Sequence, residues 1–331
     1  MHNDRGALAP RLTTQRIPAA RPVADIAADA ASGLAGRPRS MPPKYFYDEH
    51  GSRLFDAICE TPEYYPTRTE EALLRAHAGT IIADAGPTHI VEFGSGTARK
   101  TRHLLDAWDM SPQASVYWPF DVCEAMLLES GRELVRDYGE LRVNALVGDY
   151  LGGLQGLPQL REPCLFLFLG GTIGNFTSEQ ATAFLREVRA IMKPQDALLL
   201  GADRVKREDL LHAAYNDNQG ITAQFNLNLL RVLNRELDAD FSLERFEHRA
   251  SFNPLASQIE MYLVSRCDQS VHVGALEETL HFSRGETILT EISRKFTPAR
   301  LEDLLARAGF AVDDHLEPDN GFFSLVLARP V

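Results

Sequence analysis

Short apolar runs alternate with stretches of helical spacing from about residue 70 to residue 204. The apolar runs predict five buried strands, at 90–93, 114–120, 141–147, 164–169 and 197–200. Before and between them, apolar residues recur every three or four positions and predict helices at 70–85, 97–108, 124–138 and 178–193. Regular alternation of strand and helix is typical of a doubly wound parallel sheet, so we expect an α/β fold.

The pattern changes after Asp203. Two helical stretches and three strand-like runs predict an inserted, mainly antiparallel subdomain, with helices at 208–215 and 226–237 and strands at 246–252, 258–271 and 278–293. Within the last run, Ser283-Arg-Gly-Glu is expected to form a turn. The chain then returns to the main sheet through a helix at 297–308 and strands at 311–316 and 322–327. This closing antiparallel hairpin on a parallel sheet is similar to that of class I methyltransferases and distinguishes the chain from dinucleotide dehydrogenases.

The N-terminal part has a different character. Residues 1–22 mix Arg, Pro, Thr and Ala without periodicity, which predicts a flexible tail, and a helix is expected at 23–34. Tyrosines then gather in a short segment, at Tyr45, Tyr47, Tyr64 and Tyr65. Some of them must pack a helical subdomain onto the main sheet. Because buried hydroxyls need partners, the segment is also a candidate pocket wall or lid.

These patterns divide the chain into three parts. We expect a tail at 1–22, a smaller α+β substrate-binding subdomain at 23–68 and 205–295, and a cofactor-binding domain at 69–204 and 296–331.

A glycine turn follows the first strand of the main sheet, at Glu92-Phe-Gly-Ser-Gly. Gly94 and Gly96 allow a sharp turn and a close approach of the backbone to a ligand. Such a turn between a strand and a helix is the usual seat of a nucleotide-like cofactor. A third glycine at dinucleotide spacing is missing, and the carboxylate of Glu92 would repel a pyrophosphate but attract an ammonium or sulfonium. The turn therefore favours S-adenosylmethionine.

Acidic residues also end the next two strands. Ligands of open α/β sheets bind outside the carboxyl ends of the strands. Asp121 is expected to accept the ribose hydroxyls, and Asp149 with the backbone of Tyr150 to receive the adenine amino group. Lys100 is expected to approach the methionine carboxylate, although it also suits a solvated helix surface.

Composition limits the partners. The net charge of −12 argues against a general nucleic-acid binder, because phosphate backbones demand basic patches. No apolar run reaches membrane-spanning length and no signal peptide is apparent, so we expect a cytoplasmic protein without membrane contact. The four cysteines lie far apart, so we expect reduced thiols and no metal.

Six segments make the chain recognisable, at Pro43-Lys-Tyr-Phe-Tyr-Asp, Pro62-Glu-Tyr-Tyr-Pro-Thr-Arg, Glu92-Phe-Gly-Ser-Gly-Thr, Phe168-Leu-Gly-Gly-Thr-Ile-Gly-Asn, Ile259-Glu-Met and Thr290-Glu-Ile-Ser-Arg-Lys-Phe. Over about residues 38–330 the chain resembles the histidine-specific, S-adenosylmethionine-dependent N-methyltransferases of ergothioneine biosynthesis. The glycine turn is shared by all class I methyltransferases, whereas the tyrosine segments and the Thr-Glu-Ile-Ser stretch are far more specific. The resemblance implies transfer of three methyl groups to the α-amine of L-histidine, through its mono- and dimethylated forms, to give hercynine.

The resemblance also implies roles for seven residues. Asn175 and Tyr215 would hold the amino and carboxylate end of the substrate. Tyr47 would lie beside the reacting amine, where it and Asn175 are the candidate catalytic residues. The remaining four would surround the imidazole, with Tyr64 beside it or the cofactor, Met261 shaping that side, and Glu291 and Ser293 hydrogen-bonded to its two nitrogens.

Other interpretations stay open. The same fold could methylate another amino acid or a small amine, or the chain could bind S-adenosylmethionine without catalysis. Asn175, Tyr215, Glu291 and Ser293 together disfavour both alternatives. A dinucleotide oxidoreductase is a more distant third, disfavoured by Glu92 and the closing hairpin. We expect a monomer.

Overall fold

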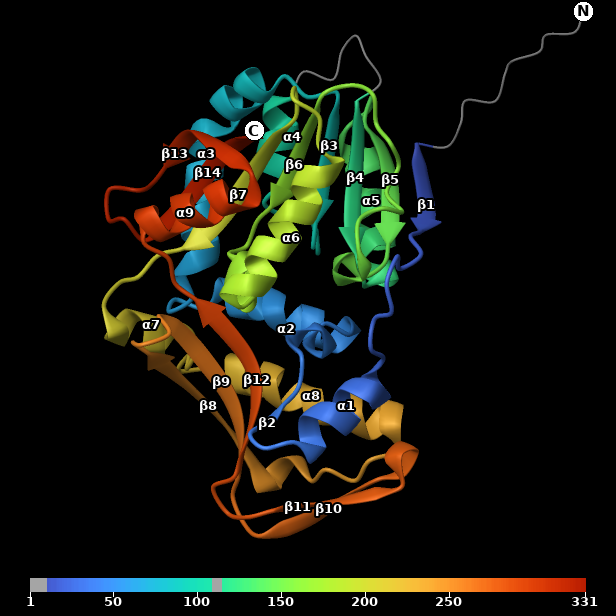
Figure 1. The fold of residues 1–331 in the computed structure, drawn as a ribbon, viewed down its shortest axis with the longest axis vertical. Helices are drawn as coiled ribbons and strands as arrows, with labels where there is room; N and C mark the ends of the chain where they lie inside the picture. The colour runs from blue at the N-terminus through green and yellow to red at the C-terminus, as the bar shows by residue number, and fades with distance from the viewer. Residues whose placement is uncertain (1–10, 109–114) are drawn as a thin grey trace, which may run out of the picture.

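An eight-stranded sheet forms the centre of the computed structural model, which describes residues 11–108 and 115–331 (Figure 1). The strand order is β1-β5-β4-β3-β6-β7-β14-β13, in which β14 pairs antiparallel with both of its neighbours, β7 and β13, and every other pair of neighbours is parallel. The strands are β1 (Leu12–Arg16), β3 (His89–Phe93), β4 (Val116–Asp121), β5 (Arg142–Val147), β6 (Cys164–Phe168), β7 (Ala197–Asp203), β13 (Phe310–Leu316) and β14 (Phe323–Pro330). The predicted class I methyltransferase sheet with its closing hairpin is confirmed.

Helices cover both faces of this sheet. One face carries α3 (Tyr65–Ala85), α4 (Arg102–Ala107) and α5 (Glu124–Asp137), and the other carries α6 (Ser178–Ile191) and α9 (Pro298–Ala308). Side chains of β3 alternate between the layers: Ile90 packs with α3 and α4, whereas Val91 and Phe93 pack with α6 and α9. A strand buried on both faces explains the continuous apolar runs of the sequence.

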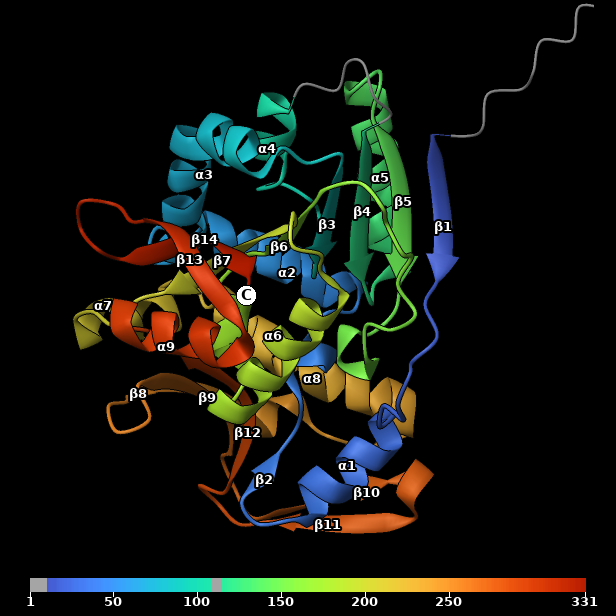
Figure 2. The same ribbon diagram turned by 45° about the horizontal axis from the view of Figure 1, so that its top comes forward.

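A second unit lies against the carboxyl ends of the parallel strands (Figures 1 and 2). Its four-stranded sheet has the order β2-β12-β9-β8, and a separate hairpin pairs β10 with β11. The strands are β2 (Arg39–Ser40), β8 (Phe246–Asn253), β9 (Gln258–Ser265), β10 (Gln269–Val273), β11 (Glu278–Phe282) and β12 (Thr287–Arg294). Its helices are α1 (Ile26–Ala35), α2 (Glu49–Glu60), α7 (Glu208–Ala214) and α8 (Ile221–Leu237). The N-terminal segment and the later insertion thus share one apolar core.

The expected flexible tail is wrong for residues 11–22. Leu12–Arg16 forms β1, which pairs in parallel with β5 along the edge of the large sheet. The backbone groups of an edge strand need partners, and β1 supplies them. Leu12 packs beside Gly131 of α5, where an added Cβ would lie 2.8 Å from the leucine. The chain then reaches α1 through bonds from the amides of Ala20 and Arg21 to the Gly152 carbonyl. Residues 1–10 lie outside the described residues.

Several further boundaries differ from the sequence prediction. α3 and α8 each begin five residues earlier than expected, at Tyr65 and Ile221. The helix expected from Thr97 begins only at Arg102, because the chain after the glycine turn makes further turns first. The run at 258–271 breaks into two strands, since a turn at 266–268 interrupts it, whereas the turn expected at Ser283-Arg-Gly-Glu is confirmed between β11 and β12. Within 11–108 and 115–331, no helix is long and apolar enough to cross a membrane.

Candidate active site

A cavity of about 720 Å³ lies where the second unit meets the carboxyl ends of β3, β4 and β5. The main sheet contributes Gly94, Asp121 and Asp149 to its wall, and the second unit contributes Tyr47 and Glu291. Each predicted cofactor residue lines this cavity: Glu92, Gly94, Gly96, Lys100, Asp121, Asp149 and Tyr150. These residues lie together at the carboxyl ends of the strands, as expected for a ligand site of an open α/β sheet. Which ligand atom each residue contacts stays a prediction.

The glycine turn has the backbone that glycine favours. Gly94 has φ of 70° and Gly96 has φ of 50°, both in the left-handed region. The amide of Gly94 donates to the carbonyl of Phe120 at 2.8 Å, and the amide of Gly96 donates to Asp121 Oδ2 at 3.0 Å. Burial raises the pKa of Asp121, while amide donors, including that of Cys123, lower it. Asp121 thus holds the turn as well as facing the cavity.

Glu92 is buried beneath the turn. Its Oε2 accepts the hydroxyls of Thr101, at 2.6 Å, and Tyr117. Burial raises its pKa to about 7, although these hydroxyls oppose the shift. A cationic ligand beside it would favour the charged form. One oxygen of the carboxylate is therefore engaged within the protein, and Glu92 also lines the cavity.

Lys100 has a partner that its sequence position did not indicate. Its Nζ lies 2.6 Å from Oε2 of the wholly buried Glu70, whose carboxylate also accepts the amide of Gly170 at 2.9 Å. Burial opposes the charge on Lys100, but Glu70 outweighs it and raises the pKa of the lysine. Lys100 is thus a fixed cation in the cavity wall and not a solvated helix lysine.

Asp149 and Tyr150 close the adenine end predicted for the cavity. Asp149 Oδ1 accepts the amide of Leu151 at 2.8 Å, which caps a short 3₁₀ turn. The ring of Tyr150 packs edge-on against Phe120 and Phe168, with centroids 6.4 and 5.9 Å away. These contacts hold the ring of Tyr150 in the cavity wall, where an aromatic ring suits a planar base.

A smaller cavity of about 50 Å³ adjoins the large one, and shares Tyr47, Asn175 and Glu291 with it. All seven substrate residues implied by the resemblance line this smaller cavity: Tyr47, Tyr64, Asn175, Tyr215, Met261, Glu291 and Ser293. They come from both units and are up to 246 positions apart in the chain (Tyr47 to Ser293). Their convergence is the strongest feature of the site.

The two residues predicted to bind an imidazole share one face of β12. Glu291 lies opposite Met261 of β9, and Ser293 lies two positions further along. A register shift between Leu289 and Glu291 re-aims the strand at this point. Burial raises the pKa of Glu291 to about 7, with Lys295 acting in the opposite direction.

Tyrosine rings form much of the remaining wall. Tyr47 and Tyr64 both meet Phe55 edge-on, at centroid distances of 5.7 and 6.2 Å. Burial raises the pKa of Tyr47, and Glu291 adds to the effect. Its hydroxyl therefore stays protonated near neutral pH and orients a ligand better than it removes a proton.

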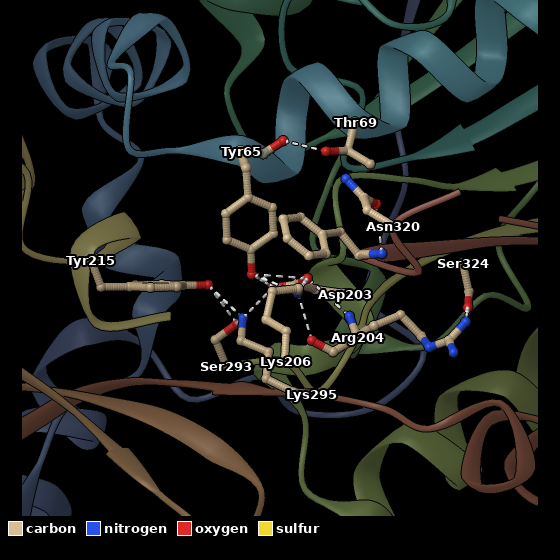
Figure 3. A network of polar contacts seen from close by, with 11 residues as sticks. Tyr65, Thr69, Asp203, Arg204, Lys206, Tyr215, Ser293, Lys295, Asn320 and Ser324 are labelled. Atoms are coloured by element: carbon tan, nitrogen blue, oxygen red, sulfur yellow. Dashed lines mark hydrogen bonds and ion pairs between the residues drawn. The ribbon is translucent and has the colours of Figure 1, made fainter. Parts of the chain in front are cut away.

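A buried polar network behind the small cavity was missed by the sequence prediction (Figure 3). Asp203 ends β7 and accepts hydrogen bonds from Tyr65 and Lys206, while Lys295 bonds to both Asp203 and Ser293. Asp203 follows a buried strand, as Asp121 does, and that position was the available signal. It stands at the end where ligands bind.

A family model described as "Histidine-specific methyltransferase, SAM-dependent" matches residues 26–330. The chain belongs to this family. Within it, the chain is 44% identical to the histidine N-alpha-methyltransferases of Mycolicibacterium smegmatis and Mycobacterium tuberculosis, over 91% of this chain and 93% of each relative. It is also 30% identical to ergothioneine biosynthesis protein 1 of Neurospora crassa, over 76% of this chain and 30% of that longer protein. The expected membership is confirmed.

Proposed function

We propose that the protein transfers methyl groups from S-adenosylmethionine to the α-amine of L-histidine, three times in succession, to give the betaine hercynine for ergothioneine biosynthesis. Membership of a histidine-specific family and the relatives at 44% identity support histidine as the substrate. The observation that carries the proposal is the convergence of the seven candidate substrate residues on one small cavity, which shares Tyr47, Asn175 and Glu291 with the glycine-turn cavity.

The residues of the large cavity fit S-adenosylmethionine. Gly94 turns in a conformation that a side chain would strain, and carboxylates at Glu92 and Asp121 suit an ammonium and ribose hydroxyls. S-adenosylmethionine supplies an electrophilic methyl group on a sulfonium. We assign its ribose to Asp121, its base to Asp149 and Tyr150, and its methionine carboxylate to Lys100.

The chain's own contribution is alignment and exclusion of water. Displacement at a methyl group requires the amine lone pair to lie in line with the breaking bond, and a desolvated wall favours that geometry. We assign Asn175 and the ring of Tyr215 to the amino-acid end of histidine, since the Tyr215 hydroxyl is already bonded to Ser293 and Lys295. We assign Tyr47 to orientation of the reacting amine. The tyrosine and phenylalanine rings can hold the growing cationic head by cation–π attraction.

Mass spectrometry tests the proposal directly. The purified protein is incubated with S-adenosylmethionine and an equimolar pool of amino acids, and products are fragmented. We expect mono-, di- and trimethylated histidine, with every methyl group on the α-nitrogen. A methyl group on the ring would contradict the substrate orientation. Methylation of another amino acid in place of histidine would contradict the substrate, and no turnover would favour a binding protein.

A further inference from the structure

Lys295 follows β12, two positions beyond Ser293, and its side chain is wholly buried. Its ammonium lies 2.8 Å from Asp203 Oδ2 and donates to Ser293 Oγ and to the Tyr215 hydroxyl oxygen, each at 2.9 Å. An ammonium has three N–H donors, and these three acceptors use all of them (Figure 3).

The network keeps this cation charged. Burial disfavours the charge on Lys295, but Asp203 and Tyr215 outweigh it and raise the pKa of the lysine. Asp203 is itself fixed from the other side, where it accepts the Tyr65 hydroxyl at 2.8 Å and pairs with Lys206. Lys295 therefore has one position and one charge state at neutral pH.

Both acceptor positions of the Ser293 hydroxyl are occupied within the protein. Its oxygen has two lone pairs. One accepts Lys295, and the other accepts the Tyr215 hydroxyl at 2.8 Å, since a phenol is more acidic than an alcohol and is the better donor. The hydrogen of Ser293 remains, and Ser293 lines the small cavity. A ligand there meets a hydroxyl that can donate but cannot accept.

We propose that Lys295 is a positioning residue that fixes Ser293 as a hydrogen-bond donor, so that the site takes a neutral imidazole in one tautomer. The bare ring nitrogen faces Ser293 and the ring N–H faces the carboxylate of Glu291. This inference rests on the proposed function, because it concerns how the same cavity reads histidine. It assigns to Lys295 a part in specificity without contact with the substrate.

The test compares histidine with the two pyrrolylalanines, in which one ring nitrogen is replaced by C–H and the other keeps its N–H. Dissociation constants are measured by calorimetry with S-adenosylhomocysteine present. In the parent, a pyrrole strands the Ser293 hydrogen, so histidine should bind at least about tenfold tighter. In Lys295→Met, the lone pair of Ser293 Oγ that accepted from Lys295 becomes free, and the Ser293 hydroxyl can rotate. The preference for histidine over the pyrrolylalanines should therefore fall by about tenfold.

Lys206→Met is the matched control, because Lys206 is a buried lysine on the same Asp203 carboxylate and makes no bond to Ser293. It should keep the parent's preference for histidine. An unchanged preference in Lys295→Met would overturn the inference, and so would an equal fall in both variants, since that would indicate general loosening.

A measurement on the unaltered protein covers the case in which Lys295→Met does not fold. The ¹⁵N spectrum of bound ring-labelled histidine should show one protonated and one bare nitrogen. Two protonated nitrogens would overturn the inference while leaving the proposed function intact. Failure of the parent to bind or methylate histidine would instead overturn the proposed function.

Discussion

Glu70 and Lys100 form an ion pair in the wall of the large cavity, with Lys100 Nζ 2.6 Å from Glu70 Oε2. Glu70 also accepts the amide of Gly170, so the pair ties α3 to the loops after β3 and β6. The lysine is held in place while the N–H groups not used by Glu70 remain available to a ligand.

Replacing Lys100 should weaken binding of the cofactor's amino-acid part alone. Lys100→Met is expected to weaken the binding of S-adenosylhomocysteine by about tenfold, because one hydrogen bond to a charged group is lost. Binding of 5′-methylthioadenosine, which lacks the carboxylate, should change little. Asp121→Ala should weaken both ligands, because both contain the ribose. Calorimetry on the parent and the two variants gives the six dissociation constants, and equal weakening of both ligands by Lys100→Met would contradict the assignment.

Replacing Gly94 should prevent cofactor binding. Gly94→Val forces a β-branched residue to φ near 70° at the cavity wall. Gly86→Val is the control, because Gly86 has φ of 52° at the end of α3 and open space around it. Both variants should lose stability, but only Gly94→Val should lose S-adenosylmethionine binding in calorimetry. Tight binding to Gly94→Val would rule out this placement.

Replacing Glu291 should relax the choice of substrate. Glu291→Ala removes the acceptor for the ring N–H and enlarges the cavity. We expect kcat/KM for histidine to fall by roughly tenfold or more, for a lost buried hydrogen bond of about 1–3 kcal/mol. The preference for histidine over tryptophan should fall in Glu291→Ala and should fall further in the double variant that also carries Met261→Val. The check is the histidine/tryptophan ratio of kcat/KM, and an unchanged ratio in all three proteins would mean that the imidazole is read elsewhere.

The raised pKa of Glu291 makes a prediction for the ligand-free protein. Burial raises it from 4.5 to about 7, so the folded state binds more protons than the unfolded state between these values. This contribution to stability is present at low pH and is lost as the pH rises through about 7. Glu291→Gln should therefore gain stability relative to the parent between pH 5 and pH 8, by roughly 2–3 kcal/mol at most.

Urea unfolding at the two pH values measures this gain. Glu278→Gln, an exposed change on β11, controls for net charge. A gain that is the same at both pH values, or one shared by Glu278→Gln, would show that Glu291 does not carry a buried charge in the empty site.

The main sheet could be predicted from sequence because its strands are buried on both faces and therefore consist of continuous apolar runs. β1 could not, since an edge strand such as Leu12–Arg16 is mostly exposed and its pairing partner lies 131 positions away (Leu12 with Val143). The turn at 283–286 was predicted because it contains a glycine, whereas the turn at 266–268 was missed because Arg-Cys-Asp contains neither glycine nor proline.

The residues of the candidate site likewise differ in whether the sequence alone could predict them. Asp121 and Asp149 follow from position alone, because strand ends meet at one edge. Glu291 and Ser293 came from family resemblance, since a strand serine has no signal of its own. Asp203 had the same strand-end signal as Asp121, but its pairing with Lys295 was missed because a buried ion pair depends on two units meeting, which no local pattern encodes.

The connectivity of the two units limits how ligands can come and go. The described chain passes between them at four places: before α1, between α2 and α3, between β7 and α7, and between β12 and α9. A large rotation of one unit away from the other would have to change the conformation of all four connecting segments at once and separate Asp203 from Lys295. We therefore expect product to leave through small displacements of the cavity wall, so that its release rate follows side-chain packing rather than a hinge.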